Sequence, residues 1–272
     1  MIHLFPSIKK RTLLLCGLFL AMLGVFSVLY GVSPLILILI AMIGGLVIAA
    51  LQAVSAVATH NQLLDILYNQ LNPAGFLALY QPLLHVPVKN ASLSLMVHLH
   101  ISNAYCAQGR FDEAQALLSS FPIKSGRKLE EELLTRFSIL SNLCYCAEQK
   151  SDIDAAQRHL DDLLAIKKKL EDLQKDKPEK KRLAFSTDLN EQCMKFLTTG
   201  KADIETLKQL SQNNNQLLHK VTISLWICRA YLAVNNRREA EKLLERIVNV
   251  ASDLYPGKVA AELLAALPAK KS

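Results

Sequence analysis

Hydrophobic and polar positions divide the chain into two parts that meet near residue 59. The stretch 12–59 contains no Lys, Arg, Asp, Glu or His. A helix needs about 20 apolar residues to cross a hydrocarbon layer about 30 Å thick, so this stretch is long enough for two crossings. Gly31-Val32-Ser33-Pro34 interrupts it, and proline suits the first turn of a helix because its missing N–H needs no partner there. We therefore predict a membrane anchor over residues 1–59, with transmembrane helices at about 12–32 and 34–58.

From residue 60 the apolar positions follow the spacing of amphipathic helices. Leu63, Leu64, Leu67 and Leu71, for example, fall on one helical face. Proline, glycine and asparagine separate such segments, and no stretch shows the alternation typical of a strand. We predict an all-α domain of antiparallel helix pairs over residues 60–272. Its helices are expected at residues 60–71, 73–84, 91–108, 111–121, 129–148, 152–175, 183–197, 202–213, 216–234 and 237–254, with a capping helix at 258–267.

Five glycines lie in the apolar stretch. Gly17, Gly24 and Gly31 recur every seven residues and so share one helical face, while Gly44 and Gly45 lie in the second predicted crossing. Small residues allow close approach of two helices in a membrane, which predicts that the two crossings pack on each other through these glycines. Glycine is also common in membrane helices for no packing reason, and the sequence leaves both interpretations open.

The charges next to the apolar stretch predict its orientation. Lys9, Lys10 and Arg11 directly precede it, and such clusters stay on the cytoplasmic side of a membrane. Two crossings return the chain to that side, so we expect an integral protein of the plasma membrane with both termini and the helical domain in the cytoplasm. A cleaved signal peptide ending at Ala56-Val57-Ala58 is the alternative, but the apolar region of a signal spans only 7–15 residues.

The rest of the chain is nearly balanced in charge. The whole chain has 31 basic and 24 acidic residues, and because Lys9, Lys10 and Arg11 supply three of the basic ones, 28 basic residues remain against the 24 acidic ones. A nucleic-acid partner is not expected, because such proteins concentrate positive charge on one face. The segment between Lys167 and Arg182 carries eight basic and four acidic residues. Mixed signs predict a solvated helix or linker, and contact with anionic lipid remains the alternative.

No sequence motif of a common catalytic or cofactor site occurs, and we expect neither enzyme activity nor a cofactor. His98, His100 and Cys106 do not predict a metal site, because residues two apart on a helix point in different directions. The six cysteines include no C-x-x-C pair and are expected to be free thiols, all but one of them in the helical domain. Trp226 is expected in the core, although a position in a binding groove is open.

Three stretches of the helical domain resemble one another and a known family. Residues 103–114 read Asn-Ala-Tyr-Cys-Ala-Gln-Gly-Arg-Phe-Asp-Glu-Ala, and residues 230–240 align with them without a gap. Residues 152–156 give a third, weaker instance. The pattern resembles the tetratricopeptide repeat (TPR), with an aromatic residue in the first helix, glycine or asparagine in the turn and alanine in the second helix. The spacing between instances is longer than the usual 34 residues, so the repeats would be divergent.

The resemblance implies a TPR-like α-solenoid whose first helices line a concave surface that holds a peptide. Transferred position by position, it places a set of side chains in or beside that groove. These peptide-groove candidates are Leu99, Asn103, Cys106, Tyr145, Leu225, Arg229 and Leu232. Polar members of the set, such as Asn103 and Arg229, are expected to hydrogen-bond a peptide backbone or terminal carboxylate.

Together these features predict a membrane-anchored TPR-like scaffold that binds a protein or peptide partner at the cytoplasmic face. The lipid bilayer is its other expected partner, and no metal is expected. An alternative is an accessory subunit of a membrane complex, assembled through the transmembrane hairpin. A more remote alternative is an enzyme whose site lies in the helical domain, which a deep pocket of converging polar groups would favour.

Overall fold

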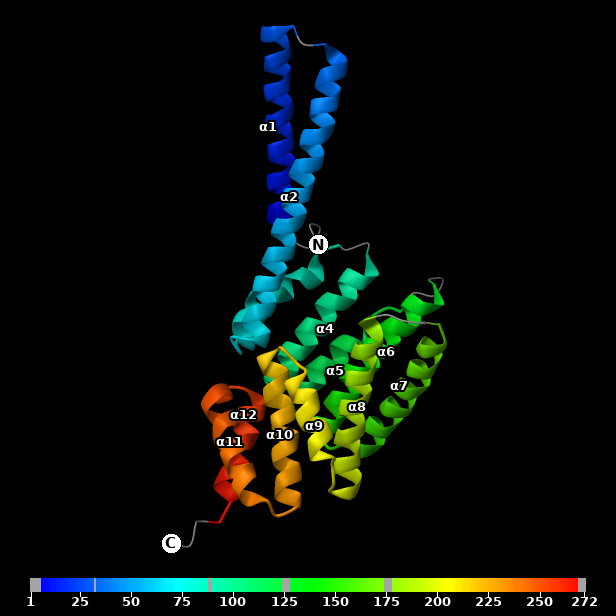
Figure 1. Ribbon diagram of the computed structural model, residues 1–272, viewed down its shortest axis with the longest axis vertical. Helices are drawn as coiled ribbons and strands as arrows, with labels where there is room; N and C mark the ends of the chain where they lie inside the picture. The colour runs from blue at the N-terminus through cyan, green and yellow to red at the C-terminus, as the bar shows by residue number, and fades with distance from the viewer. Residues whose placement is uncertain (1–5, 32, 88–89, 124–127, 174–177, 269–272) are drawn as a thin grey trace.

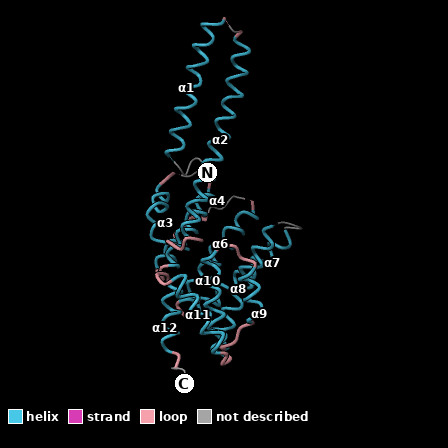
Figure 2. The backbone as a smooth tube through the Cα atoms, turned by 60° about the vertical axis from the view of Figure 1, so that its left-hand side comes forward, coloured by secondary structure: helices cyan, strands magenta, loops and turns pink. Residues whose placement is uncertain are grey.

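The computed structural model describes residues 6–31, 33–87, 90–123, 128–173 and 178–268. This part of the chain forms twelve α-helices and one 3-10 helix, and no strand occurs in it (Figures 1 and 2). The all-α prediction is therefore confirmed for the described residues.

The chain begins with a hairpin of two helices that stands apart from the other helices (Figure 1). Helix α1 spans Pro6–Tyr30 and helix α2 spans Pro34–Tyr68. Gly31 ends α1 with a φ of +59°, a conformation that glycine adopts without strain. Both helices are long and apolar enough to cross a membrane, and their apolar windows are not buried in the protein.

Helix α2 does not end at the expected domain boundary near residue 59. Its 35 residues extend to about 52 Å at 1.5 Å per residue, more than a hydrocarbon layer of about 30 Å requires. Beyond Thr59, the side chains of Leu63, Leu64 and Leu67 pack into the core of the helical domain. A continuous helix therefore joins the hairpin to the domain and fixes the orientation of one relative to the other.

The glycines of the hairpin do not form the expected packing surface. A Cβ atom at Gly17, Gly24, Gly31 or Gly45 would meet no atom within 4 Å, so none of these positions packs on the neighbouring helix. Gly44 alone lies at the contact between the helices, where the ring of Phe19 fills the space above it. The seven-residue spacing correctly places Gly17 and Gly24 on one face, but that face is turned away from α2.

The helical domain follows in a regular order. After α2 come α3 (Pro73–Tyr80), η2 (Gln81–His85), α4 (Ala91–Ala107), α5 (Phe111–Ser119), α6 (Leu129–Gln149), α7 (Ile153–Leu173), α8 (Pro178–Thr199), α9 (Ile204–Gln212), α10 (Leu217–Ala233), α11 (Arg237–Ala251) and α12 (Tyr255–Ala266). Several of the starts have side-chain caps, in which a side-chain oxygen accepts hydrogen bonds from the first free backbone N–H groups. The capping residues are Asn72, Asn90, Asp152 and Asp203. Most of the expected helices are present, with their ends shifted by a few residues. The helix expected at 60–71 is instead the end of α2, and the one expected at 73–84 is divided into α3 and η2.

The three similar stretches share one turn geometry. Gly109, Ser151 and Asn235 have φ values of +80°, +57° and +57°, each five residues before the alanine of the second helix. At each turn the next backbone N–H donates to the carbonyl five residues earlier, at 2.9 to 3.0 Å. Asn235 thus adopts the left-handed conformation that its alignment with Gly109 predicts. The similarity among these stretches is structural as well as sequential.

The helix pairs are arranged so that the end of the chain returns to its beginning. Helix α4 packs on α6 and α6 on α8, while α10 contacts α2, and α12 contacts α4 as well as α11. The rings of Phe111 and Tyr255 meet edge to face at 4.8 Å, and Tyr255 also lies against Gly109. Helix α12, expected to cover a free end of the array, therefore lies against the first helix pair.

Two expectations about the core are confirmed. Trp226 is 2% exposed and its ring meets that of Phe196 at 5.8 Å, so it belongs to the core. All six cysteines are free, and five of them, Cys106, Cys144, Cys146, Cys193 and Cys228, are buried in the helical domain.

Candidate functional site

A cavity of about 670 Å³ lies between the helices that open the successive pairs. Helices α4, α6, α8 and α10 supply most of its wall, with Tyr68 from α2 and Pro256 from α12. This volume falls within the range of about 300 to 1,000 Å³ typical of ligand sites. The cavity is the candidate functional site.

The cavity has an open end and a closed end. Ser92, Glu131 and Arg182 line it near the starts of α4, α6 and α8, and their side chains are exposed. These helices begin at the end of the domain nearest the hairpin (Figure 1). At the opposite end the lining residues Cys106, Ala107 and Pro256 are buried. The mouth of the cavity therefore faces the side on which the hairpin lies.

Each of three inner helices contributes one carboxamide to the lining. These are Asn103 on α4, Asn142 on α6 and Asn190 on α8. Asn103 donates to the hydroxyl of Tyr68 at 2.8 Å, and Asn142 donates to the carbonyl of Ser138 at 3.0 Å. The Nδ2 of Asn190 makes no hydrogen bond within the described protein, although Asn190 is only 3% exposed. A buried donor without a partner is costly unless a ligand provides an acceptor.

Hydroxyl groups and apolar side chains alternate over the rest of the wall. The hydroxyls belong to Thr135, Ser138, Ser141, Ser186 and Thr222. The hydroxyls of Ser141 and Ser186 hydrogen-bond each other across α6 and α8. The larger apolar side chains are those of Leu99, Leu134, Phe137, Phe185 and Leu189.

A hydrogen-bonded chain joins α2 to α4 at the wall. The oxygen of Tyr68 accepts from Asn103 and lies 2.8 Å from Nδ1 of His100. The hydroxyl of Tyr68 thus links the carboxamide of Asn103 to the ring of His100. Burial, together with neighbouring His60 and His219, lowers the pKa of His100 to about 3. Burial also lowers the pKa of His219, which packs edge-on against Tyr68 at 5.3 Å, to about 4.

The other buried titratable groups of the wall are also neutral. A contact with the Cys146 thiol at 3.5 Å, followed by burial, raises the pKa of Cys106 well above its ordinary value. Burial raises the pKa of Tyr145 well above its ordinary value. Among the described residues of the lining, the charged side chains are those of Glu131 and Arg182 at the mouth.

Four of the seven groove candidates line the cavity and three lie elsewhere. Leu99, Asn103, Cys106 and Tyr145 belong to the wall. Leu225 is 2% exposed in the core, and the guanidinium of Arg229 lies 4.6 Å from the ring centroid of Trp226. Leu232 does not belong to the lining either. The alignment matched the last turns of α4 with the last turns of α10 and so predicted that both line the groove. In the structure, α10 lines the cavity with its first two turns instead.

Several residues that line the cavity were not predicted from the sequence. His219 and Thr222 lie on the part of α10 that faces the cavity, and Asn190 lies on α8, for which no repeat was aligned. On α6 the signal was readable, because Ser138, Asn142 and Tyr145 follow a helical spacing of four and three residues.

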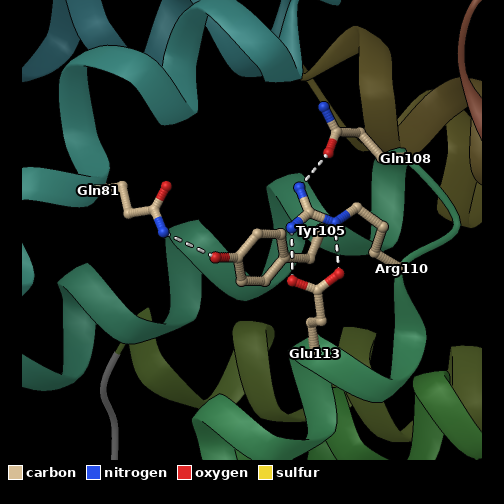
Figure 3. Close-up of polar contacts among 5 residues, drawn as sticks. All are labelled: Gln81, Tyr105, Gln108, Arg110 and Glu113. Atoms are coloured by element: carbon tan, nitrogen blue, oxygen red, sulfur yellow. Dashed lines mark hydrogen bonds and ion pairs between the residues drawn. The ribbon is translucent and has the colours of Figure 1, made fainter.

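A second polar cluster lies at the turn between α4 and α5, outside the cavity (Figure 3). The Nε of Arg110 donates to Glu113 at 2.6 Å, and NH1 donates to Gln108 at 3.0 Å. The guanidinium lies 4.4 Å from the ring centroid of Tyr105, whose hydroxyl accepts from Gln81 at 3.1 Å. Arg110 and Glu113 are largely exposed, so this cluster holds the turn and η2 in place but encloses no ligand space.

The charged segment between Lys167 and Arg182 is divided between two helices. Its first part ends α7 and its last part begins α8, while residues 174–177 lie outside the described residues. The Nζ of Lys167 donates to the hydroxyl of Thr187 on α8 at 3.0 Å. Arg182 reaches the mouth of the cavity.

Comparison with known proteins gives no match: no protein-family model, no curated protein and no solved structure is similar to this chain.

Proposed function

We propose that this protein is a binding protein without catalytic activity, anchored in a membrane by the α1–α2 hairpin, that holds a segment of a partner protein in its cavity. The observation that carries the proposal is the wall of that cavity. Three inner helices each contribute a carboxamide to it, hydroxyls lie between them, and the Nδ2 of Asn190 has no acceptor within the described protein. A carboxamide donates and accepts hydrogen bonds, so it complements the N–H and C=O groups of a peptide backbone.

The membrane anchor rests on length, composition and charge. Both helices of the hairpin meet the length and hydropathy needed for a crossing, and their apolar side chains are exposed. Lys10 and Arg11 lie in the first turns of α1. The positive-inside tendency then puts this end, and with it the helical domain, on the cytoplasmic side.

A TPR-like array is the proposed origin of the domain. Its support is the common geometry of the turns at Gly109, Ser151 and Asn235 and the lining of one cavity by α4, α6, α8 and α10. The contact between α12 and α4 makes this array more closed than an open solenoid. A closed arrangement explains why the site is a cavity and not a long shallow groove.

The titratable groups of the wall favour binding over catalysis. A general acid or base works best with a pKa near the operating pH. The pKa of His100 is lowered to about 3 and that of His219 to about 4, both far below neutral pH. The pKa values of Cys106 and Tyr145 are raised. All four are therefore uncharged at neutral pH and suited to hydrogen bonding and packing.

A quantitative affinity purification tests this function. The full-length protein, its Asn142→Leu/Asn190→Leu variant and a Ser119→Trp control would be purified from the same cells, and the co-purifying proteins compared. Ser119 is exposed on α5 and remote from the cavity lining. We expect one or more proteins to be depleted at least tenfold by the double substitution and retained by the control. Identical sets of proteins for all three would contradict the proposal.

A second candidate function is assembly of a membrane complex through the hairpin. The observation that favours it is the open face of α1 at Gly17 and Gly24, where another helix could approach closely. A Gly17→Leu/Gly24→Leu variant should then lose its co-purifying membrane proteins while the cavity variant retains them. The opposite result would eliminate this candidate.

A further inference from the structure

We infer that the partner segment held in the cavity is an uncharged loop, entering and leaving through the mouth that faces the hairpin. This inference rests on the proposed function and specifies the chemistry of the partner. It excludes charged side chains and free chain ends from the buried part of the segment.

Below its mouth, the described lining of the cavity has no charged side chain that could pair with a charged occupant. Among the described lining residues, Glu131 and Arg182 are charged, and both are exposed at the mouth. Below them the polar groups are carboxamides, hydroxyls and the neutral rings of His100 and His219. A charged group carried into this space would lose its water without gaining an ion partner, which is strongly unfavourable. At the mouth, Glu131 and Arg182 can pair with charges that flank the loop.

Polar groups are spread along the whole length of the cavity. Hydroxyls and carboxamides continue from the mouth at Ser92 to the closed end at Asn103 and Asn190. Most of these groups already donate within the protein, so an occupant meets their remaining acceptor oxygens and the unpartnered Nδ2 of Asn190. A peptide backbone supplies N–H groups for these oxygens and a C=O group for Nδ2, whereas a lipid chain supplies neither. Apolar side chains of the loop fit between Leu134, Phe137 and Phe185. A peptide is therefore the favoured occupant over an amphiphile.

The end of the cavity opposite the mouth is closed. Ala107 and Pro256 are buried there, and the contact of Phe111 with Tyr255 holds α12 against the first helix pair. An extended chain cannot run through such a space, so it must end inside or turn back. Chain ends carry a charge, and the interior of the cavity offers no group of opposite charge to pair with it. A turn with neutral polar residues at its tip, such as Asn, Ser or Gly, satisfies both conditions.

The unpaired carboxamide of Asn190 marks where the tip of the loop binds. Its Nδ2 is buried and has no acceptor within the described protein. A backbone carbonyl or a neutral side-chain oxygen at the tip would accept from it. Asn142, one helix away, provides a further carboxamide for the same turn.

The experiment is a selection from a library of loops. Random loops of about ten residues, fixed at both ends in a carrier domain, would be selected against the full-length protein in lipid nanodiscs. The probe thereby lacks free ends, as the inference requires. A Ser138→Trp variant, which places a large side chain in the cavity, serves as the blocked form. Ser119→Trp is the matched control, since it adds the same side chain to an exposed position of α5.

We expect selected loops whose central residues are uncharged, and whose binding is lost in the blocked form but kept in the control. Replacing a central Asn of such a loop by Asp, or a central Met by Lys, should weaken binding at least tenfold. Loops that need the cavity yet carry charged centres would overturn the inference and leave the proposed function standing. Failure to select any loop sensitive to Ser138→Trp would overturn both. Native mass spectrometry of the purified protein tests for a bound amphiphile. An amphiphile that co-purifies with the wild type but not with the Ser138→Trp variant would show that the occupant is not a peptide.

Discussion

Acid should destabilise the helical domain through two histidines beside the cavity. The pKa of His100 is lowered to about 3 and that of His219 to about 4, whereas an exposed histidine has a pKa of 6.5. The unfolded chain therefore binds these protons at a higher pH than the folded chain does. Their contribution to stability is complete above about pH 6.5 and is lost as the pH falls toward 4 and 3.

The size of the effect follows from the same shifts. At about pH 5 each unfolded histidine is almost fully protonated, while each folded one is still largely neutral. One pKa unit corresponds to about 1.4 kcal/mol, so lowering the pH from about 7.5 to about 5 costs about 2 kcal/mol per histidine. The pair together costs up to about 4 kcal/mol, a large part of the stability of an ordinary domain. His60 and Tyr68 also lie against His100, and neither carries a negative charge in this range that would favour its protonated form.

Denaturant unfolding in detergent, followed by tryptophan fluorescence, measures this loss. Trp226 is the only tryptophan and is buried in the helical domain, so its signal reports the domain and not the hairpin. A His100→Gln/His219→Gln variant should lose less than half as much stability as the wild type over this pH range. Glutamine offers both a donor and an acceptor to the hydroxyl of Tyr68. His98→Gln, on the same helix but outside the cavity lining, is the control.

Equal pH dependence of the wild type and the double variant would refute the reasoning. It would mean that both rings titrate in the folded protein as they do in the unfolded chain, so that the cavity gains positive charge as the pH falls.

Three further predictions concern single positions. Asn190→Leu should stabilise the domain by about 1 kcal/mol in the same unfolding assay, because it removes an unpaired buried donor, and it should weaken loop binding; destabilisation would show that Asn190 is already satisfied. Burial raises the pKa of Glu148 well above its ordinary value, so stability is complete below about pH 4.5 and falls as the pH rises; Glu148→Gln should be the more stable form at about pH 8 by more than about 1 kcal/mol, and an unchanged pH profile would contradict this. Gly44→Leu should separate the hairpin helices because of Phe19 and lower the yield of monodisperse protein, whereas Gly45→Leu should not; equal yields would contradict the observed contact.

The sequence was sufficient for the order and type of the helices. Apolar spacing and caps such as Asn72 and Asn90 act locally, within one or two turns of the chain, so they can be recognised without the fold. The left-handed turn at Asn235 was predictable for the same reason, from its alignment with Gly109.

The arrangement of the helices was not predictable in the same way. The return of α12 to the first helix pair depends on a contact between Phe111 and Tyr255, which are far apart in the sequence. Similarly, the rotation of α1 about its own axis decides whether Gly17 faces α2, and the spacing of the glycines says nothing about it.

The candidate site was predicted in part, and the reason lies in the transfer from one repeat to another. Asn103 and Tyr145, which the pattern shared by α4 and α6 assigned to a groove, lie at the wall of the cavity. Arg229 was misplaced because α10 faces the cavity with its opposite end. Asn190 could not be found at all, since the sequence of α8 does not show the residues that mark the repeated pattern.

Photo-crosslinking from inside the cavity is the most direct test of the central claim. A photoreactive phenylalanine analogue at Ser138, on the wall, would be activated in intact cells and compared with the same analogue at Ser119, on the outer surface. The account predicts a covalent adduct with a specific polypeptide from Ser138 alone, lost in the Asn142→Leu/Asn190→Leu background. Mass spectrometry should locate the link in an uncharged loop of that polypeptide. Adducts that are the same from both positions, or a cavity position that links only to lipid, would contradict the account.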